Sequence, residues 1–180
     1  MTIYNPLPRI ESNHRNLTIR GQKLPTLVKP QDPAQSSMND ISIAGPNTIA
    51  ASASISHAST EMQLHSTHIL LVTSTAESLQ LAGMVSSIDL MGEKPIILAQ
   101  KRKLNREDIT VSMVMHNLDQ ILILDKHIVD KSKIGNIIAT LETHEADFAL
   151  VTQPGHGDQL TVCGFFDTAQ IRIQLHQRQR

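Results

Sequence analysis

From about Met38 onward, apolar and polar positions recur regularly enough to predict a small unit of strands and helices. In order, the predicted elements are an extended piece at 48–50, a helix that begins after Ser52 or Ser54, strands at 68–73 and 79–85 on either side of a turn at 74–78, and a helix that begins at Ser86. Ile55, Ala58 and Met62 recur at helical spacing and form the inner face of the first helix. The unit therefore has the order β-α-β-β-α.

The same order of elements recurs in the second half of the chain. Its elements are extended residues between Ile121 and Val129, a helix at about 133–144, strands at 147–152 and 160–166 around a turn at 154–158, and a helix at 168–177. Ile55 and Ile134 lie 79 residues apart, whereas Gly83 and Gly164 lie 81 residues apart. A β-α-β-β-α unit duplicated at this period predicts an α+β fold whose two small halves pack on each other.

Residues 1–33 precede the repeat and are interpreted as an N-terminal arm. Five prolines interrupt this stretch and no period persists, yet it has too many apolar residues for a purely disordered tail. We expect the arm to dock in extended form along a neighbouring module, so that its deletion weakens association and leaves the fold intact. The other predicted boundaries are 34–99 for the first domain, 100–110 for a linker and 111–178 for the second domain.

Composition narrows the classes of function. The 180 residues carry a net charge of -1, only 2% of them are aromatic and none is Trp, which argues against a basic nucleic-acid face and aromatic platforms for bases. The one cysteine, Cys163, excludes an internal disulfide and fits a reducing compartment. No apolar run approaches the length of a membrane span, and no signal-peptide pattern opens the chain. The sequence predicts a soluble, cytoplasmic protein that binds neither nucleic acid nor membrane.

The stretch from Gly83 to Asp89 carries the main candidate chemistry. Gly83 has no Cβ to obstruct a ligand or a neighbouring strand. Ser86 is a good helix N-cap, and the free amides of a first helical turn attract anions. Asp89, one turn further on, could accept two hydroxyl hydrogen bonds from a sugar. Two interpretations follow. The stretch is either a binding site for a phosphorylated ribose, or a strand-to-helix turn in which Ser caps the helix and Asp interacts favourably with the helix dipole.

The unit closed by Gly-h-h-Ser-x-x-Asp, where h is an apolar residue, resembles a CBS domain, named from cystathionine β-synthase. Two such units in tandem resemble the CBS pair called a Bateman module, and the likeness is closest to bacterial stand-alone CBS-pair proteins. The resemblance covers roughly 34–178 and is carried by the stretches 88–95, 109–115, 134–141 and 164–171. It implies tandem β-α-β-β-α domains packed as a pseudo-twofold pair.

The resemblance also implies a regulatory module that binds an adenosine nucleotide (AMP, ADP or ATP) in the cleft between the two domains. Asp89 would hold the ribose hydroxyls, with Ser86 as its companion and Gly83 at the turn. The residues implied to face the base are Thr48, Ile49, Ile69 and Leu70. No cofactor is required, and binding would be coupled to the state of an oligomer or of a regulated partner protein that the sequence does not identify.

The second copy of the motif departs from the pattern. Asp167 stands where Ser or Thr is expected, and Gln170 stands where Asp is expected. A carboxylate at the phosphate end repels an anionic ligand, and Gln is a weaker acceptor than a carboxylate. We therefore expect at most one nucleotide per chain. A ligand-free dimerisation scaffold with two degenerate sites stays open as the alternative.

Other residue clusters give weaker signals. His65 and His68 have a plausible metal-ligand spacing, but no Cys or carboxylate is in register with them, so no metal site is expected. Cys163 lies in an apolar strand and is interpreted as an inert thiol. No acid, base and nucleophile converge in the pattern, so no enzymatic activity is expected.

The closing helices of the two units carry more apolar residues than a small module needs to leave near its rim. These residues are Leu90, Met91, Ile171, Ile173 and Leu175. CBS pairs commonly associate through such helices, so the resemblance implies a homodimer.

Overall fold

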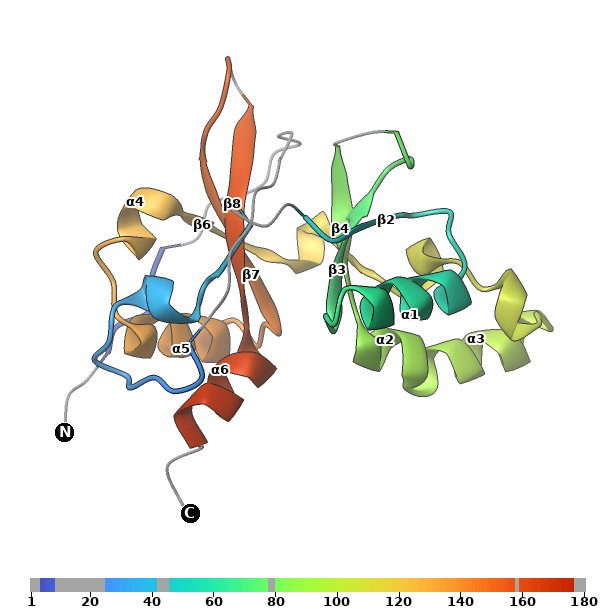
Figure 1. The fold of residues 1–180 in the computed structure, drawn as a ribbon, viewed down its shortest axis with the longest axis horizontal. Helices are drawn as coiled ribbons and strands as arrows, with labels where there is room; N and C mark the ends of the chain where they lie inside the picture. Colours follow the sequence, from blue (N-terminus) through green and yellow to red (C-terminus); the bar gives the residue numbers. More distant parts are fainter. Residues whose placement is uncertain (1–3, 9–24, 42–45, 78–79, 158, 177–180) are drawn as a thin grey trace. The chain divides into compact units, whose positions relative to one another are not determined.

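The computed structural model describes residues 4–8, 25–41, 46–77, 80–157 and 159–176. The chain divides into two compact units (Figure 1), of which unit 1 comprises residues 1–45 and 119–180 and unit 2 comprises residues 46–118. Each unit contains a four-stranded sheet together with helices, so the predicted α+β class is confirmed.

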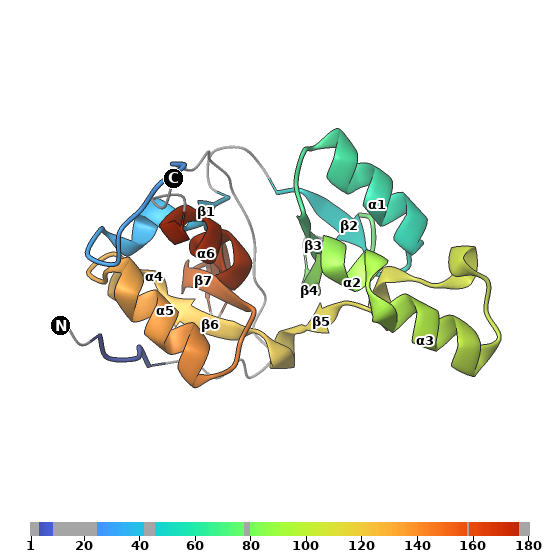
Figure 2. The same cartoon turned by 90° about the horizontal axis from the view of Figure 1, so that it is seen from below.

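Unit 2 is built on a mixed sheet whose strands follow the order of the sequence. The strands are β2 (Thr48–Ala50), β3 (Ile69–Thr73), β4 (Leu81–Ser86) and β5 (His116–Asn117), with β2 parallel to β3 and the other neighbours antiparallel. The helices are α1 (Ile55–Leu64), α2 (Ser87–Met91) and α3 (Glu93–Arg102), which can be followed in Figure 2. The Ser54 side chain accepts a hydrogen bond from the His57 amide, which fixes the start of α1.

The core of unit 2 lies between one face of this sheet and its helices. Leu70 of β3 packs there with Ile55 of α1 and Leu90 of α2. Because side chains alternate along a strand, Ile69 and Leu71 point to the opposite face. Ile109, a residue of the predicted linker, is also fully buried in this core. The stretch 100–110 therefore belongs to the folded unit.

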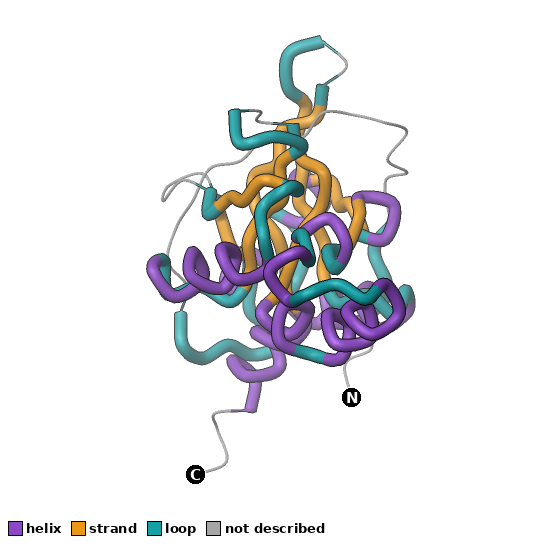
Figure 3. Tube along the Cα trace, turned by 90° about the vertical axis from the view of Figure 1, so that its right-hand side faces the viewer, coloured by secondary structure: helices purple, strands orange, loops and turns teal. Residues whose placement is uncertain are grey.

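Unit 1 repeats the architecture with the same pairing pattern. Its strands, in spatial order, are β6 (Leu122–Asp125), β7 (Phe148–Pro154), β8 (Leu160–Asp167) and β1 (Asn39–Asp40), and its helices are α4 (Lys126–Val129), α5 (Ile134–Thr143) and α6 (Thr168–His176). Ile134 and Ile137 of α5, with Ile171 of α6, pack onto Val151 and Phe166 of the sheet. Strands and helices are distinguished by colour in Figure 3.

The predicted duplication is confirmed at the level of strand register. Val72 pairs with Gly83 in unit 2, and Val151 pairs with Gly164 in unit 1. A register shift follows immediately after each of these valines. The two extra residues of the second copy therefore fall within the β7–β8 hairpin, where an insertion leaves the rest of the sheet in register.

The fourth strand of each sheet comes from the chain that precedes the other repeat. β5 lies just before the second repeat but pairs with β4 of unit 2, and β1 lies just before the first repeat but pairs with β8 of unit 1. A Cβ on Gly164 would lie 2.7 Å from the Asn39 carbonyl oxygen, and one on Gly83 would collide with the His116 carbonyl. The two glycines thus admit these edge strands. The observed units consequently differ from the predicted boundaries, which gave 34–45 to the first domain and 111–118 to the second.

Two helices lie where the sequence predicted none. α4 begins within the stretch 121–129 that was expected to be extended, because the Asp125 side chain accepts a hydrogen bond from the His127 amide and caps a short helix. α3 follows α2 after a break at Gly92 and carries Pro95 in its first turn. Proline is tolerated there because the first amides of a helix have no partner within it.

The described parts of the arm lie on the helices of unit 1. The Leu7 amide donates to Thr140 Oγ1 of α5 at 2.7 Å. The Val28 amide donates to the Gln174 carbonyl of α6 at 3.3 Å, and the Gln174 side chain donates to the Pro25 carbonyl at 2.7 Å. Residues 25–33 form no helix, as predicted, but Val28 is part of the unit 1 core. Removing 1–33 would take Val28 out of this core, so the structure favours a destabilised unit 1 over the expected intact fold. Residues 9–24 lie outside the described part.

The apolar surface predicted on the closing helices is only partly exposed. Leu90 and Ile171 are buried in the cores of their units, whereas Met91 and Ile173 are exposed. Ile88 beside Met91 is 74% exposed. Among the described residues, none of the helices combines the length and the apolar character that crossing a membrane requires.

Candidate functional site

Asp89 lies in the first turn of α2, directly after β4 ends at Ser86. Ser86 Oγ accepts a hydrogen bond from the Asp89 amide at 3.2 Å. In return, Asp89 Oδ2 accepts from the Ser86 amide at 3.0 Å and from Ser86 Oγ at 2.7 Å. This is a capping box, which pairs two amides that the helix itself leaves without partners. The interpretation of the motif as a strand-to-helix turn is thus realised.

The other carboxylate oxygen of Asp89 holds two cationic or polar side chains. Asp89 Oδ1 lies 3.0 Å from Lys94 Nζ of α3 and 3.1 Å from His116 Nε2 of β5. Lys94 Nζ also donates to the Val114 carbonyl at 3.0 Å. We call Ser86, Asp89, Lys94 and His116 the Asp89 cluster. Since a carboxylate offers about four acceptor positions, this one is fully engaged within the chain.

The electrostatics of the cluster keep Asp89 ionised. Burial by itself raises the pKa of the carboxyl group, but hydrogen bonds from His116, from the side chain and backbone of Ser86, and from Lys94 outweigh it. The pKa of Asp89 is therefore held well below its usual range. The Asp89 side chain is only 7% exposed, so the unit carries a buried and fully paired negative charge.

Sequence reasoning found Ser86 and Asp89 but missed Lys94 and His116. Lys94 stands five residues after Asp89, a spacing that does not put two side chains on the same face of one continuous helix. The two meet here because the chain breaks at Gly92, between α2 and α3. His116 reaches Asp89 through the β4–β5 pairing, which joins stretches on opposite sides of α3. The one signal for Lys94 in the sequence was its place in the stretch 88–95, which resembles a CBS domain.

The remaining predicted ligand residues are separated by the fold. The space beside Gly83 is filled by the backbone of His116, so this glycine accommodates a neighbouring strand. Ile49 and Leu70 point into the helix-covered core. Thr48 and Ile69 lie on the opposite face by alternation, and Ile69 pairs with Ser86 across the sheet. Of the four residues expected to face a base, Ile69 is thus the neighbour of the Asp89 cluster.

The second motif is occupied by contacts within unit 1. Asp167 Oδ1 accepts from the Ala169 amide at 2.9 Å, and Gln170 Oε1 accepts from Asn39 Nδ2 at 3.0 Å. Asn39 pairs with Phe165, and His116 pairs with Met84. Because Phe165 and Met84 each follow the equivalent glycine of their unit, Asn39 and His116 occupy equivalent positions on the edge strands. In each unit, therefore, the edge strand is fastened to the same position of the closing helix. The contact is neutral in unit 1 and charged in unit 2.

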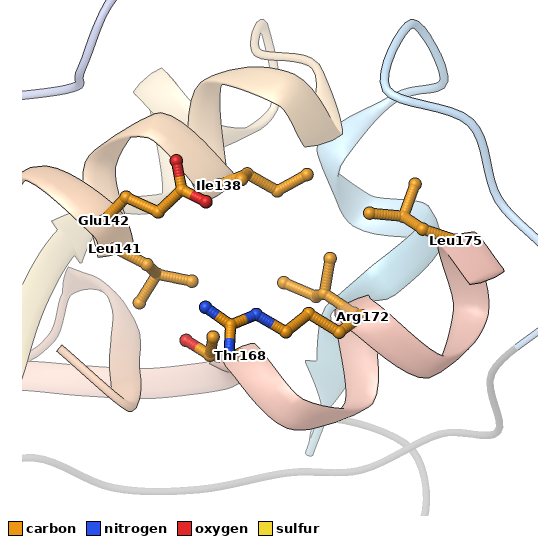
Figure 4. Close-up of a pocket in the computed structure, with 7 residues that line it drawn as sticks. Ile138, Leu141, Glu142, Thr168, Arg172 and Leu175 are labelled. Atoms are coloured by element: carbon orange, nitrogen blue, oxygen red, sulfur yellow. The ribbon is translucent and has the colours of Figure 1, made fainter. Parts of the chain in front are cut away.

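A pocket of about 170 Å³ lies between α5 and α6 of unit 1 (Figure 4). Ile138, Leu141 and Ile171 give it an apolar lining, and Glu142 and Arg172 come from the two different helices at its edge. It is smaller than the roughly 300–1,000 Å³ typical of small-molecule sites. No predicted ligand residue lines it.

Metal and thiol chemistry receive little support from the described residues. Among them, no three His, Cys, Asp or Glu side chains are grouped so that they could hold a metal ion. His65 Nε2 lies 3.4 Å from Glu61 on the surface of α1. Burial raises the pKa of the Cys163 thiol to about 11, which agrees with an inert thiol.

The chain matches no protein-family model, and no curated protein matches its sequence. Solved structures do match. An uncharacterised conserved protein from Pyrococcus horikoshii has a TM-score of 0.53 at 17% identity, over 85% of this chain and 97% of that one. A haemolysin-like protein of Oenococcus oeni that contains a CBS domain has a TM-score of 0.53 at 14% identity, over 81% and 92%. CBSX2, solved in complex with AMP, has a TM-score of 0.51 at 15% identity, over 78% and 93%.

These likenesses are structural, and they show the fold. The chain folds as a tandem pair of CBS domains, as its sequence resemblance implied.

Proposed function

We propose that this chain is a regulatory, non-catalytic CBS pair that binds one adenosine nucleotide (AMP, ADP or ATP) at the Asp89 cluster. Binding would be coupled to the state of a homodimer or of a partner protein. The observation that carries the proposal is the buried, ionised carboxylate of Asp89 at the start of α2, beside a serine hydroxyl and two donor side chains. The similarity to a protein solved with AMP supports the choice of ligand class.

The chemistry of the cluster fits a phosphorylated ribose. A carboxylate accepts hydrogen bonds from vicinal hydroxyls, and a lysine ammonium binds phosphate as a point charge. Ser86 and the first-turn amides of α2 would lie beside the sugar in this proposal. Because both oxygens of Asp89 already accept two hydrogen bonds, a ribose must replace a donor of the chain. Lys94 is the most replaceable donor, since its side chain is 50% exposed.

Of the two motifs, both of which lie in the described part of the chain, the one in unit 2 offers this chemistry. At the second motif the corresponding residue is Gln170, which is uncharged and accepts from Asn39. Asp167 adds a carboxylate beside it. We therefore propose one nucleotide per chain.

A binding experiment tests the proposal. A thermal-shift panel with AMP, ADP, ATP and S-adenosylmethionine should raise the unfolding temperature for at least one nucleotide, because a ligand of the native state stabilises it by mass action. Calorimetry should then give one site per chain. Asp89→Ala should weaken binding roughly ten- to hundredfold, because it removes a charge-assisted hydrogen bond worth about 1.5–3 kcal/mol.

Gln170→Ala is the matched control, since it changes the equivalent residue of unit 1. It should leave nucleotide affinity within about twofold, a change of a few tenths of a kcal/mol, because the proposed site does not use Gln170. Circular dichroism must show that both variants fold, because Asp89→Ala also removes the capping box. Equal losses from the two variants would contradict the single site.

The alternative function is a ligand-free dimerisation scaffold. It is favoured by the complete engagement of Asp89 within the chain and by the exposed Ile88 and Met91 on α2. A dimer in light scattering, together with no thermal shift from any nucleotide, would select this alternative.

A further inference from the structure

Beyond the residues of the motif and of the edge strand, the two units also differ at Lys94. The edge strand contacts the closing helix in both units, through His116 to Asp89 in unit 2 and through Asn39 to Gln170 in unit 1. This contact therefore links the edge strand to the closing helix in both units. By contrast, Leu175 stands five residues after Gln170, where Lys94 stands five residues after Asp89. The lysine is the added feature of unit 2.

Lys94 holds its position through two acceptors, Asp89 Oδ1 and the Val114 carbonyl. His116 has a lower exposure, 23% for its side chain against 50% for Lys94, and its backbone is fixed in the β4–β5 ladder. A lysine ammonium on a flexible four-carbon stem reorients more readily than an imidazole whose backbone is paired. Lys94 is therefore the donor that can leave Asp89 while the sheet stays intact.

The charge balance determines what can replace it. When ribose hydroxyls take the place of Lys94 on Asp89 Oδ1, the ammonium loses its anionic partner. An anionic phosphate on the same ligand can then form a new ion pair with the Lys94 ammonium. An uncharged nucleoside cannot, and a ligand with a positive sulfonium group adds repulsion.

We propose that Lys94 is a specificity-determining residue that restricts the Asp89 cluster to phosphorylated adenosine ligands. Lys94 competes with the ribose of every ligand for Asp89 Oδ1. Only a ligand that carries a phosphate offsets the loss of the Lys94–Asp89 ion pair, because it pairs with the lysine in turn. The inference rests on the proposed function, because it requires that the cluster bind a ribose.

Calorimetry with AMP and adenosine on the full chain tests this role. Wild-type protein should bind AMP at least about tenfold more tightly than adenosine, the range of one charge-assisted hydrogen bond. Lys94→Met should weaken AMP binding and strengthen adenosine binding, so that the ratio of their dissociation constants approaches one. Lys94→Gln removes the charge but keeps an amide donor for the Val114 carbonyl; if Lys94→Met folds poorly, this variant should still weaken AMP binding and lower the ratio.

Lys101→Met is the matched control, because it removes the same charge from the exposed last turn of the same helix. The ratio should stay at its wild-type value in this variant. S-adenosylmethionine should bind wild type no more tightly than adenosine does.

Four results would overturn the inference. Equal affinity of wild type for AMP and adenosine, or an unchanged ratio in both Lys94 variants, would do so while leaving the proposed function intact. A folded Lys94→Met variant with no gain in adenosine affinity would show that the lysine does not compete for Asp89. Absence of binding of any adenosine ligand to any form would remove the proposed function as well, so the two failures are distinguishable.

Discussion

Asp89 uses both of its carboxylate oxygens to hold neighbouring elements of unit 2 together. Its Oδ2 closes the capping box of α2, and its Oδ1 joins α3 and β5 to that helix. Breaking a buried, paired charge is costly because the remaining partners lose their compensation. The proposed nucleotide, by taking over one of these bonds, would therefore act directly on the contacts that position α3 and β5.

The depressed pKa of Asp89 predicts a specific loss of stability in acid. Because the folded-state pKa lies below the unfolded value of about 3.9, the contribution of Asp89 is fully present above pH 4 and is lost as the pH falls below it. We expect wild type to be more stable than Asp89→Asn by roughly 1–3 kcal/mol at pH 6, and the difference to shrink between about pH 4 and 2. Urea denaturation of both proteins across this range measures it. A difference that stays constant down to pH 2 would contradict the assignment.

Sequence reasoning located only part of the Asp89 cluster. Ser86 and Asp89 were found because the capping motif is local, with partners three residues apart. Lys94 and His116 depend on a helix break and on a strand pairing 27 residues away, and neither leaves a periodic trace in the sequence. The same limit explains why Ile49 and Leu70 were assigned to a base: without the sheet, the direction of a side chain on a strand is undefined.

At the scale of elements, the arm is part of the architecture of unit 1. The last part of the arm is fixed by hydrogen bonds to both the main chain and the side chain of Gln174. η1 (Ala34–Ser37) then packs against α5 and α6. Ala34 and Met38 extend the unit 1 core at this point. The chain thus enters the folded unit well before the first repeat begins.

Two adjacent residues of the arm test this placement. Val28 is 5% exposed and its neighbour Leu27 is 49% exposed. Val28→Ala should lower the free energy of unfolding by about 2 kcal/mol, since it removes buried apolar volume. Leu27→Ala should change it by less than about 0.5 kcal/mol. Urea unfolding midpoints compare the two, and equal effects would indicate that the arm lies on the surface without joining the core.

The regular elements were predictable because their signals are local. The position of α1 was predictable from the helical spacing of Ile55, Ala58 and Met62 and from the Ser54 cap. The position of α5 then followed from the 79-residue offset between the repeats. β1 and β5 were not predictable, because strands of two residues carry no period. α3 was hidden by Pro95, which usually marks a helix boundary and here stands in a first turn.

At the scale of the whole molecule, the unit boundaries differ from the repeat boundaries. Unit 2 needs β5 to complete its sheet and needs Ile109, Val111 and Val114 for its core. A fragment cut by sequence repeat, at 34–99, lacks all of them. A fragment that follows the structure, at 46–118, keeps the sheet and the core together.

These two fragments give a direct test of the boundaries. The fragment 46–118 should unfold cooperatively with heat, because it retains every strand and buried residue of unit 2. The fragment 34–99 should show no cooperative transition and should expose apolar surface to a hydrophobic dye. Circular dichroism melting distinguishes them. A cooperative transition in 34–99 alone would restore the repeat as the folding unit.

The pairing of β1 with β8 has a consequence for the order of events during synthesis. Asn39 pairs with Phe165, a residue that the ribosome adds 126 positions later. At about 5–20 residues per second, the early strand waits at least several seconds for its partner, while the contiguous unit 2 can fold in the interval. A nascent chain that stops before β8 therefore carries a finished unit 2 and an unused N-terminal strand. In such an incomplete product the backbone of β1 lacks its partner strand, and we expect the chain to be cleaved there by proteases.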